Sequence, residues 1–586
     1  MTNRAAPTNA RRLAACALVA LWLAGCSSLV QLAPDPLGDL TRIQISPKTA
    51  DLLIGDLSQP PVVQVFHAIG VFSDGARRDI TQQLRWNVDN GVPGGFLTPG
   101  EFSTTNAASG HIEVIAQADT VWATADVTVR IDATIVDGAF PPSDPELFDT
   151  TKPMIADDPA RSPAILYPST NTVFPQTLPS TVIQLARGEI NDAFRLTFET
   201  DLLHVVVLTG ADRWETGALQ DVIARSNVGQ QITVTIDAAS SADPGTIYQG
   251  SPIALSFAND APDGPLYYWS AATSGIMRAA LGASSAGKLY PGAGDTTCVG
   301  CHTVSRAGTQ MAMGYGNEAA AALQTIDVPT LASTISHAKL YPTGWSTYSP
   351  DGALLLTANN GALVLRDARS GTPINSATGK ITLPAGKFAT HPEWSPDGAY
   401  VAVAYTSTQP TNLDVKAASI ARLPFDLATQ TFGAPQLLVP ATGTDNYYFP
   451  KYSPDGRVLA FVHATETSRA ASSAELALVA ANGGVVSLLA NASHLVASTS
   501  IAGTSTQMPS WAPFSGDYAW LAFASKRPYG VVVPGGGRSQ IWISAIDLAS
   551  YQPGLDPSWA GFYLSAQDPT IVNNSPIWAP STDPPQ

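Results

Sequence analysis

The chain has 586 residues, more than one hydrophobic core usually organises, so its length predicts several domains. Hydrophobic residues make up 45% of it and charged residues only 13%. The 47 glycines and 46 prolines, with many short β-branched and aromatic runs, favour a turn-rich all-β architecture. A net charge of −16 without a basic cluster argues against nucleic acid as a partner.

The N-terminus has the features of an export signal. Three arginines precede the apolar run 13–24, which is too short to span a bilayer. The run ends in Leu-Ala-Gly-Cys at Cys26, and this order of apolar core, small residues and cysteine resembles the lipobox of bacterial lipoproteins. The resemblance implies a signal peptide (1–25), lipid attachment at Cys26, a tether (26–40) and anchoring in the outer membrane, on the periplasmic or the outer side. A plain secretory signal is the alternative.

Residues 41–132 alternate apolar and polar side chains between Gly, Asp and Asn turns, which predicts a β-sandwich. The run Phe72-Ser73-Asp74-Gly75, the segment from Asp79 to Trp86 and the alternating last strand resemble the bacterial Ig-like domain of group 2. Proline and aspartate dominate residues 133–162, so we expect a linker there.

Residues 163–265 predict a second sandwich. Five strand candidates, among them "AFRLTFE" and "LLHVVVLTG", are separated by turn residues. This segment resembles fibronectin-like or Ig-like domains, and such folds do not by themselves define a function.

The rest of the chain, 266–586, is a repeat array. Small tetrapeptides recur, most of them after an aromatic residue and before an apolar strand. The copies are Ser305-Arg306-Ala307-Gly308, Ser349-Pro350-Asp351-Gly352, Ser395-Pro396-Asp397-Gly398, Ser453-Pro454-Asp455-Gly456, Ala512-Pro513-Phe514-Ser515 and Ala579-Pro580-Ser581. They resemble the "PD" repeat of TolB-like β-propellers, which implies about six blades.

Each tetrapeptide predicts a tight turn, because Pro presets φ, Asp bonds to nearby backbone and Gly accepts a positive φ. The last copy has no second strand after it. We therefore expect residues 575–581 to close the ring by joining a blade made from residues 265–281. In the alternative, 267–269 is the last strand of the preceding sandwich.

Cys298, Cys301 and His302 form a Cys-x-x-Cys-His motif, which resembles the covalent attachment site of c-type haem. In such proteins both thiols add to the haem vinyl groups, and the histidine is the proximal iron ligand. The resemblance implies one haem c. Export also fits, since c-type haem is attached outside the cytoplasm.

Three other readings of the motif stay open: a Cys298–Cys301 disulfide in an oxidising compartment, a zinc site, and a relic. No helical cytochrome domain surrounds the motif, since His302 is followed within three residues by a repeat turn. A haem here would lie at the rim or mouth of the propeller, and its exposure would lower its redox potential.

The second axial ligand is less evident. If the turn after the motif is a two-residue hairpin, Met311 pairs with His302 across the strands and lies on the wrong side for a sandwich, so we expect Met311 and Met313 mainly to fill the core. His391 stands four residues before its tetrapeptide, as Cys301 does, and is the better candidate, although it could simply cap a turn. Arg306 could pair with a haem propionate.

The sequence contains no Gly-x-Ser-x-Gly, His-Glu-x-x-His or phosphate-binding loop, so it names no catalytic residues. The function we expect is electron transfer or redox sensing at the cell envelope, with a redox or envelope protein as partner. The alternative is a non-enzymatic propeller that binds a protein or glycan and contains the disulfide. A haem-dependent enzyme is the third class.

Overall fold

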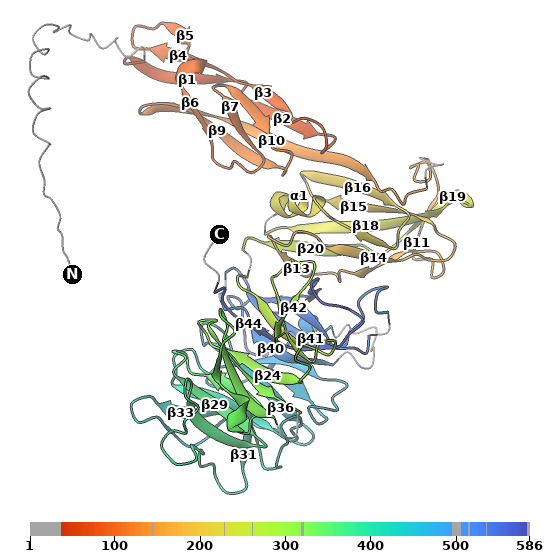
Figure 1. The fold of residues 1–586 in the computed structure, drawn as a ribbon. Helices are drawn as coiled ribbons and strands as arrows, with labels where there is room; N and C mark the ends of the chain where they lie inside the picture. The colour runs from red at the N-terminus through yellow and green to blue at the C-terminus, as the bar shows by residue number, and fades with distance from the viewer. Residues whose placement is uncertain are drawn as a thin grey trace, which may run out of the picture.

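The computed structural model describes residues 37–582, except 142–145, 228, 261, 293, 318–320, 495–504, 514–515 and 535. Cys26 and the predicted signal peptide lie outside the described residues. The helical elements are α1 (Leu219–Ser226), α2 (Ala490–Ser493), η1 (Thr81–Gln83) and η2 (His337–Lys339). None of the described helices is long and apolar enough to cross a bilayer. The predicted all-β class, with two sandwiches and a propeller, is confirmed (Figure 1).

The first sandwich packs two short sheets, β1-β4-β5 and β3-β8-β7, against the strands that surround β10. Inward residues alternate along β10, where Val127, Val129 and Ile131 are buried. Its strands are β1 (Leu40–Ser46), β2 (Thr49–Ile54), β3 (Val63–Val65), β4 (His67–Phe72), β5 (Arg77–Asp79), β6 (Arg85–Val88), β7 (Gly94–Thr98), β8 (Glu101–Thr104), β9 (Gly110–Ala118) and β10 (Val121–Val136).

The second sandwich packs the sheet β12-β14-β17 and helix α1 against a large sheet built on β15, β16 and β18. Its strands are β11 (Met154–Ala156), β12 (Ala164–Tyr167), β13 (Thr172–Pro175), β14 (Val182–Ala186), β15 (Ala193–Glu199), β16 (Leu203–Thr209), β17 (Arg213–Glu215), β18 (Gln231–Ser240), β19 (Asp243–Gln249) and β20 (Ile253–Ala258).

The two sandwiches share one sheet. Strand β10 pairs with β9 and β2 in the first sandwich and, from Ile131 to Val136, runs parallel to β16 in the second. The segment expected to be a linker therefore begins as strand. It also buries Phe140, Leu147 and Phe148 against β15, β18 and β19. These apolar residues follow no period, so the sequence pattern gave no sign of them.

Within the described part of 266–582, six sheets form six blades. Blade 1 is β24 (Val299–Val304), β25 (Gln310–Tyr315), β26 (Ala322–Asp327) and β27 (Ser333–Ile335). Blade 2 is β28 (Ser346–Tyr348), β29 (Leu354–Asn359) and β30 (Ala362–Asp367). Blade 3 is β31 (Phe388–Trp394), β32 (Tyr400–Thr406), β33 (Ser419–Asp426), β34 (Thr431–Phe432) and β35 (Gln436–Val439).

Blade 4 is β36 (Asn446–Tyr452), β37 (Val458–Ala464), β38 (Glu475–Ala480) and β39 (Ser487–Leu488). Blade 5 is β40 (Thr506–Trp511), β41 (Ala519–Ser525), β42 (Gln540–Ile546) and β43 (Phe562–Tyr563). Blade 6 is β44 (Asn573–Trp578), β21 (Leu266–Ser270), β22 (Gly275–Ala279) and β23 (Gly287–Tyr290).

Blade 6 closes the ring as expected. The last strand, β44, pairs antiparallel with β21, with Trp578 opposite Leu266 and Asn573 opposite Ser270. The six inner strands, β24, β28, β31, β36, β40 and β44, contact one another in that order, and β44 returns to β24. Residues 267–269 therefore belong to the propeller, not to the preceding sandwich.

In blades 1–4 the repeat tetrapeptides make the turns after the inner strands. In blade 3 the Ser395 hydroxyl accepts from the backbone N–H of Tyr400 at 3.0 Å and donates to Asp397 at 2.5 Å, and Gly398 has a φ of +74°. These turn bonds lower the pKa of Asp397, first through the bond from Ser395. The repeat aspartates thus form turns, as their spacing predicted.

Candidate functional site

Five of the six inner strands carry a β-bulge. The register with the next strand shifts within β24, β31, β36, β40 and β44, where two residues oppose one. The first bulge residue has a positive φ in every case; these residues are Cys301, His391, Phe449, Met508 and Ser575. Proline follows in four blades, and His302 takes that position in blade 1.

The bulges surround a passage along the axis of the ring. Its middle part, which we call the shaft, is a cavity of about 30 Å³ lined by bulge residues from blades 1 and 3–6 and by Ser346 of blade 2. At one end lies the cysteine mouth, a cavity of about 170 Å³ that shares Trp345, Met508 and Ser575 with the shaft. At the other end lies the turn mouth, about 280 Å³, which shares Lys451 and Ile577 with it.

Cys298 and Cys301 both line the cysteine mouth and are half-buried. Four glycines form part of its wall; they are Gly300, Gly314, Gly316 and Gly344. Trp269 and Trp345 also line the mouth, and the Nε1 of Trp269 is buried without a hydrogen bond. The mouth thus offers two thiols beside an apolar, aromatic surface.

His302 lies one layer deeper, in the shaft, where its side chain is 2% exposed. Neither ring nitrogen has a hydrogen bond of normal geometry, although the backbone of Tyr267 is near. Burial is the main cause that lowers the pKa of His302 to about 4, and Lys451 adds to it. The imidazole is therefore neutral at pH 7, the form that binds metals.

His391 faces the same shaft, so the structure brings the two histidines around one cavity. Its ring packs on Phe449 with centroids 3.9 Å apart and meets the edge of Trp345 at 5.1 Å. Burial in this apolar surrounding lowers its pKa to about 3, with a smaller contribution from Lys451. Its Nδ1 is also without a hydrogen bond.

The two predicted methionines lie elsewhere. Met311 and Met313 are fully buried in the core between blades 1 and 6, with Tyr267 and Ile276. The expected pairing of Met311 with His302 is wrong, because the loop after β24 has four residues (306–309) rather than two, so that Val304 is the partner of Met311.

Met508 is a candidate ligand that the sequence analysis missed. It lines both the cysteine mouth and the shaft, and its sulfur accepts a hydrogen bond from Ser575 at 3.1 Å. Met508 stands at the same position of its repeat as Cys301 and His391, so the alignment that singled out His391 could also have found it.

Arg306 is not brought together with the cysteines. It lines the turn mouth, five positions along the chain from Cys301, at the other end of the shaft. A propionate contact from Arg306 would therefore have to reach past the shaft.

The donors suit a c-type haem better than a bare metal ion. Among the described residues, no three His, Cys, Asp or Glu side chains gather closely enough to hold an ion, which speaks against the zinc reading. Two thiols and a neutral imidazole that has no hydrogen bond of regular geometry do match covalent haem attachment. The cavities are smaller than the ~300 Å³ at which sites for drug-sized ligands begin, so a porphyrin would not be enclosed here.

No family model matches this chain, and neither does any curated protein. Solved structures with a similar fold include the putative TolB from Agrobacterium tumefaciens, at 16% identity and a TM-score of 0.29, covering 52% of this chain and 90% of that one. TolB from Acinetobacter baumannii has 15% identity and a TM-score of 0.31, covering 60% and 80%. A putative 6-phosphogluconolactonase from Bacteroides uniformis has 14% and 0.32, covering 50% and 82%.

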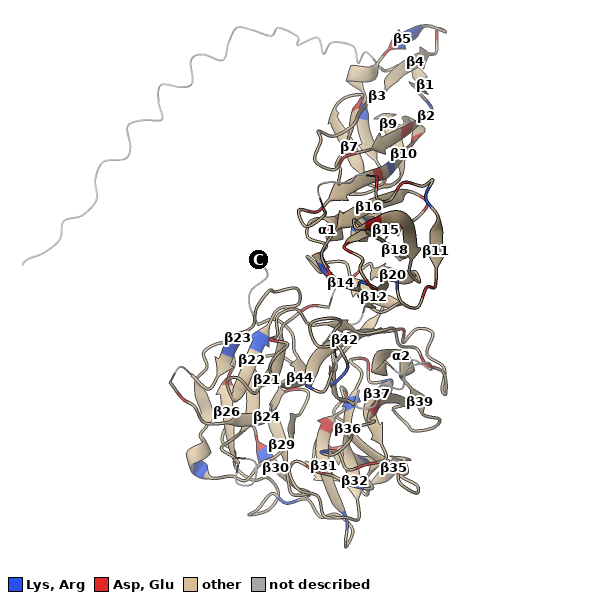
Figure 2. Ribbon diagram, turned by 90° about the vertical axis from the view of Figure 1, so that its right-hand side faces the viewer, with Lys and Arg blue, Asp and Glu red and all other residues tan. Residues whose placement is uncertain are grey.

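These identities and TM-scores are low, so the likeness says nothing about activity. The propeller is defined by this chain's own strand pairing in six sheets and by the contacts that close its ring. Figure 2 shows lysines and arginines scattered over the described residues of all three parts, without a continuous basic band.

Proposed function

We propose that this protein carries one covalent c-type haem at the cysteine mouth of its propeller and serves electron transfer or redox sensing at the bacterial cell envelope. One observation carries the proposal. Cys298 and Cys301 line a single mouth, and His302 lines the adjoining shaft as a buried neutral imidazole without a regular hydrogen bond. A buried polar group of this kind costs free energy unless it finds a partner, and an iron ion would be one.

The attachment chemistry needs no oxidant. The thiols of Cys298 and Cys301 would hold the group through thioether bonds, each of which would take up one S–H and one vinyl C=C and leave nothing to be oxidised or released. His302 would supply the proximal nitrogen. A bound haem would supply a one-electron couple at the rim of the propeller.

The small volume of the mouth supports an exposed position for this group. Exposure to water favours the more highly charged state of the iron, so we expect a low redox potential. An exposed edge also suits exchange of electrons with a second envelope protein, which is the kind of partner we propose.

Export and anchoring rest on the sequence. The apolar run 13–24 and Cys26 support an outer-membrane lipoprotein, with the two sandwiches as spacers between lipid and propeller. Replacing Cys26 by Ser should move the protein from the membrane fraction to the soluble fraction. Retention in the membrane would contradict the anchor.

The central test is expression with the c-type maturation system, followed by a haem-stained denaturing gel and a pyridine haemochrome spectrum. We expect covalent haem in the natural chain and none in the Cys298→Ala/Cys301→Ala variant. No haem, together with a mass lower by two hydrogen atoms, would instead establish the disulfide and the binding scaffold.

The same material tests the second axial ligand. His391→Ala or Met508→Leu should convert a low-spin spectrum to high-spin if that residue ligates the iron. Met311→Leu is the matched control, since Met311 lies in the core between blades 1 and 6 and should leave the spectrum unchanged. A spectral change in the control alone would reverse this assignment.

A further inference from the structure

We propose that the turn mouth is a second binding site, for the carboxylate of a small apolar molecule or of a peptide C-terminus. This site goes beyond the haem proposal and does not depend on it. The turn mouth and the cysteine mouth open at opposite ends of the shaft and share no residue.

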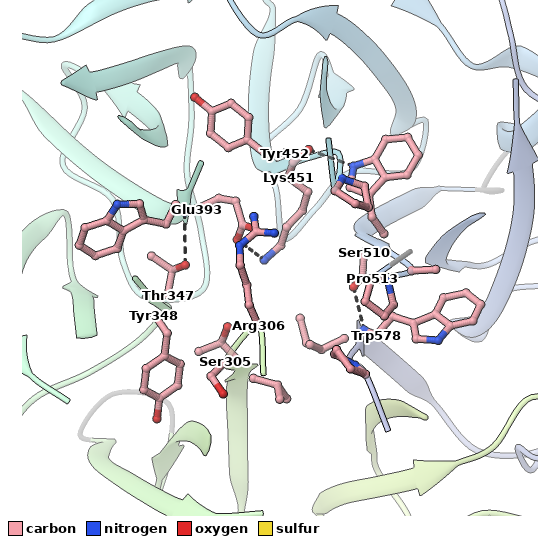
Figure 3. A pocket seen from close by; sticks show the side chains of 18 residues that line it. Ser305, Arg306, Thr347, Tyr348, Glu393, Lys451, Tyr452, Ser510, Pro513 and Trp578 are labelled. Carbon is pink, nitrogen blue, oxygen red and sulfur yellow. Dashed lines mark hydrogen bonds and ion pairs between the residues drawn. The ribbon is translucent and has the colours of Figure 1, made fainter. Parts of the chain in front are cut away.

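Each blade contributes one inward side chain to the turn mouth. In ring order these are Thr303, Thr347, Glu393, Lys451, Ser510 and Ile577. Figure 3 shows Thr347, Glu393, Lys451 and Ser510 around a common space, with Arg306 reaching in from blade 1 toward Glu393 and Lys451. The aromatic residues that precede the turns form the outer wall.

Lys451 is held in place by an ion pair but keeps donors for a ligand. Its ammonium donates to Glu393 at 2.6 Å, and both side chains are mostly buried, at 21% and 16% exposure. An ammonium has three donors, so others remain for a ligand. Because Glu393 already holds Lys451 in place, little side-chain entropy remains to be lost on binding.

Two hydroxyls also have free protons. Thr347 accepts from the backbone N–H of Trp394 at 3.3 Å, and Ser510 accepts from that of Trp578 at 2.9 Å. Neither hydroxyl donates a hydrogen bond to a described residue, so each can donate its proton into the cavity.

Arg306 is the unusual residue of the site. The other repeats have proline at this position: Pro350, Pro396, Pro454, Pro513 and Pro580. Arg306 makes no hydrogen bond or ion pair with a described residue, although it is close enough to contribute to the lowered pKa of Asp397. Its guanidinium is thus available, and its planar fork matches a carboxylate.

Charge and shape select the ligand. Arg306 and Lys451 against Glu393 leave one net positive charge in the lining, which a monoanion neutralises. A phosphate dianion would bring its second charge close to Glu393.

The indole N–H groups of Trp394, Trp511 and Trp578 are bonded to backbone oxygens, so these rings offer apolar walls rather than donors. The cavity of about 280 Å³ fits one small side chain.

Binding can be followed by tryptophan fluorescence and by calorimetry. The probes are N-acetylphenylalanine, a short peptide ending in a free Phe carboxylate, the same peptide amidated, and inorganic phosphate. We expect the free acids to bind, and the amide and phosphate to bind at least tenfold more weakly. If the free-acid peptide binds but N-acetylphenylalanine does not, the natural ligand is a chain terminus. If both bind, a small molecule suffices as the ligand.

Arg306→Pro is the decisive variant, because it installs the residue that the other turns already accommodate. It should weaken carboxylate binding about tenfold without unfolding the propeller. Arg457→Ala is the matched control, since this exposed turn arginine pairs with Asp455 and does not line the turn mouth.

The measurements are repeated on the haem-free Cys298→Ala/Cys301→Ala variant and should give the same affinities. Absence of carboxylate binding to the natural chain would overturn the proposal. Equal binding by the Arg306→Pro variant, or by the amidated peptide, would overturn it as well.

Discussion

His302 occupies a position that is proline in four of the other five blades. Proline suits a bulge because no ladder hydrogen bond is needed from its nitrogen. His302 instead places a polar ring in the shaft, where neither nitrogen has a regular hydrogen bond. Without a ligand, this residue costs the propeller stability.

Replacing His302 by proline should therefore stabilise the haem-free propeller by about 1 kcal/mol, because a buried polar group without a regular partner is removed. Chemical denaturation measures this change in stability when the Cys298→Ala/Cys301→Ala variant is compared with and without His302→Pro. Ser346→Pro is the control, since β28 pairs with β29 without a bulge and proline should destabilise it. Destabilisation by both prolines would mean that His302 is needed by the fold itself.

His463 gives a pH dependence remote from both mouths. Its ring lies between Glu475 at 3.1 Å and Asp445 at 3.2 Å and stacks on Tyr447. The hydrogen bond to Glu475 is the main cause that raises the pKa of His463. A raised pKa means that the folded state holds the proton more tightly, so this stabilisation is full below about pH 6.5 and is lost as the pH rises through the folded pKa.

We expect His463→Gln to lower the free energy of unfolding by on the order of 1 kcal/mol at pH 6, and by less at pH 9. Urea denaturation of the propeller at both pH values measures the difference. His204→Gln is the control, because its pair with Asp132 is exposed and should contribute under ~0.5 kcal/mol at either pH. A loss for His463→Gln that grows with pH would contradict the assigned direction.

At the scale of elements, the repeat turn is the unit that the sequence specifies best. The blade 1 copy lacks both Pro and Asp, yet Ser305 and Gln310 make the same backbone bond at 2.9 Å and Gly308 has a φ of +74°. The Ser305 hydroxyl also accepts from the backbone N–H of Gln310 at 3.1 Å. The serine hydroxyl and the positive φ thus define this turn more than the aspartate does.

Gly398→Ala isolates the cost of that φ. An added Cβ would meet nothing closer than Pro350 at 3.7 Å, so space is not limiting. A left-handed φ costs a non-glycine residue about 1–2 kcal/mol, and we expect the propeller to lose that much stability. Gly287→Ala, with open space and no positive φ, should be neutral or slightly stabilising. Equal effects would show that φ is not the cause.

Features that depend on local turn chemistry could be predicted from the sequence, and features that depend on packing between strands and blades could not. Turn chemistry is local, so it gave the blade number, the ring closure and the place of Cys301 and His391 at one level of the ring. A bulge depends on pairing with a second strand, which no single tetrapeptide contains. The turn loop, with four residues instead of two, decided the partner of Met311. The sharing of residues between the shaft and the mouths depends on packing among six blades, which no single repeat encodes.

At the scale of the molecule, the three parts are held together by structure rather than by flexible segments. Strand β10 continues from the first sandwich into the second. The second sandwich packs on blade 5, where the hydroxyl of Tyr167 accepts from the backbone N–H of Tyr563 at 3.1 Å and its ring meets Tyr529 edge-on at 4.9 Å. Figure 1 shows the resulting stack of the three parts.

Ring closure is the step on which the whole propeller depends. Strand β44 pairs with β21 and contacts β24, β40 and β41, so it joins three blades. Trp578 is 5% exposed, its backbone N–H donates to Ser510, and its indole donates to Gly264 at 3.0 Å. Trp578→Ala should lower the free energy of unfolding by about 3–5 kcal/mol, the usual cost of removing a buried large aromatic side chain.

Truncation after residue 570 removes the whole strand, and we expect it to abolish the cooperative unfolding of the propeller. The control is Trp122→Ala, because Trp122 is 62% exposed on the first sandwich and should contribute little. Thermal melts followed by circular dichroism compare the truncated chain, the Trp578→Ala variant and the Trp122→Ala variant. We expect the loss of stability to decrease in that order. If the truncated chain still melted cooperatively near the natural temperature, the five remaining blades would form a stable arc, and β44 would only cover its edge. A sharp loss instead would mean that the stacking of blades stabilises the propeller only once the ring is closed.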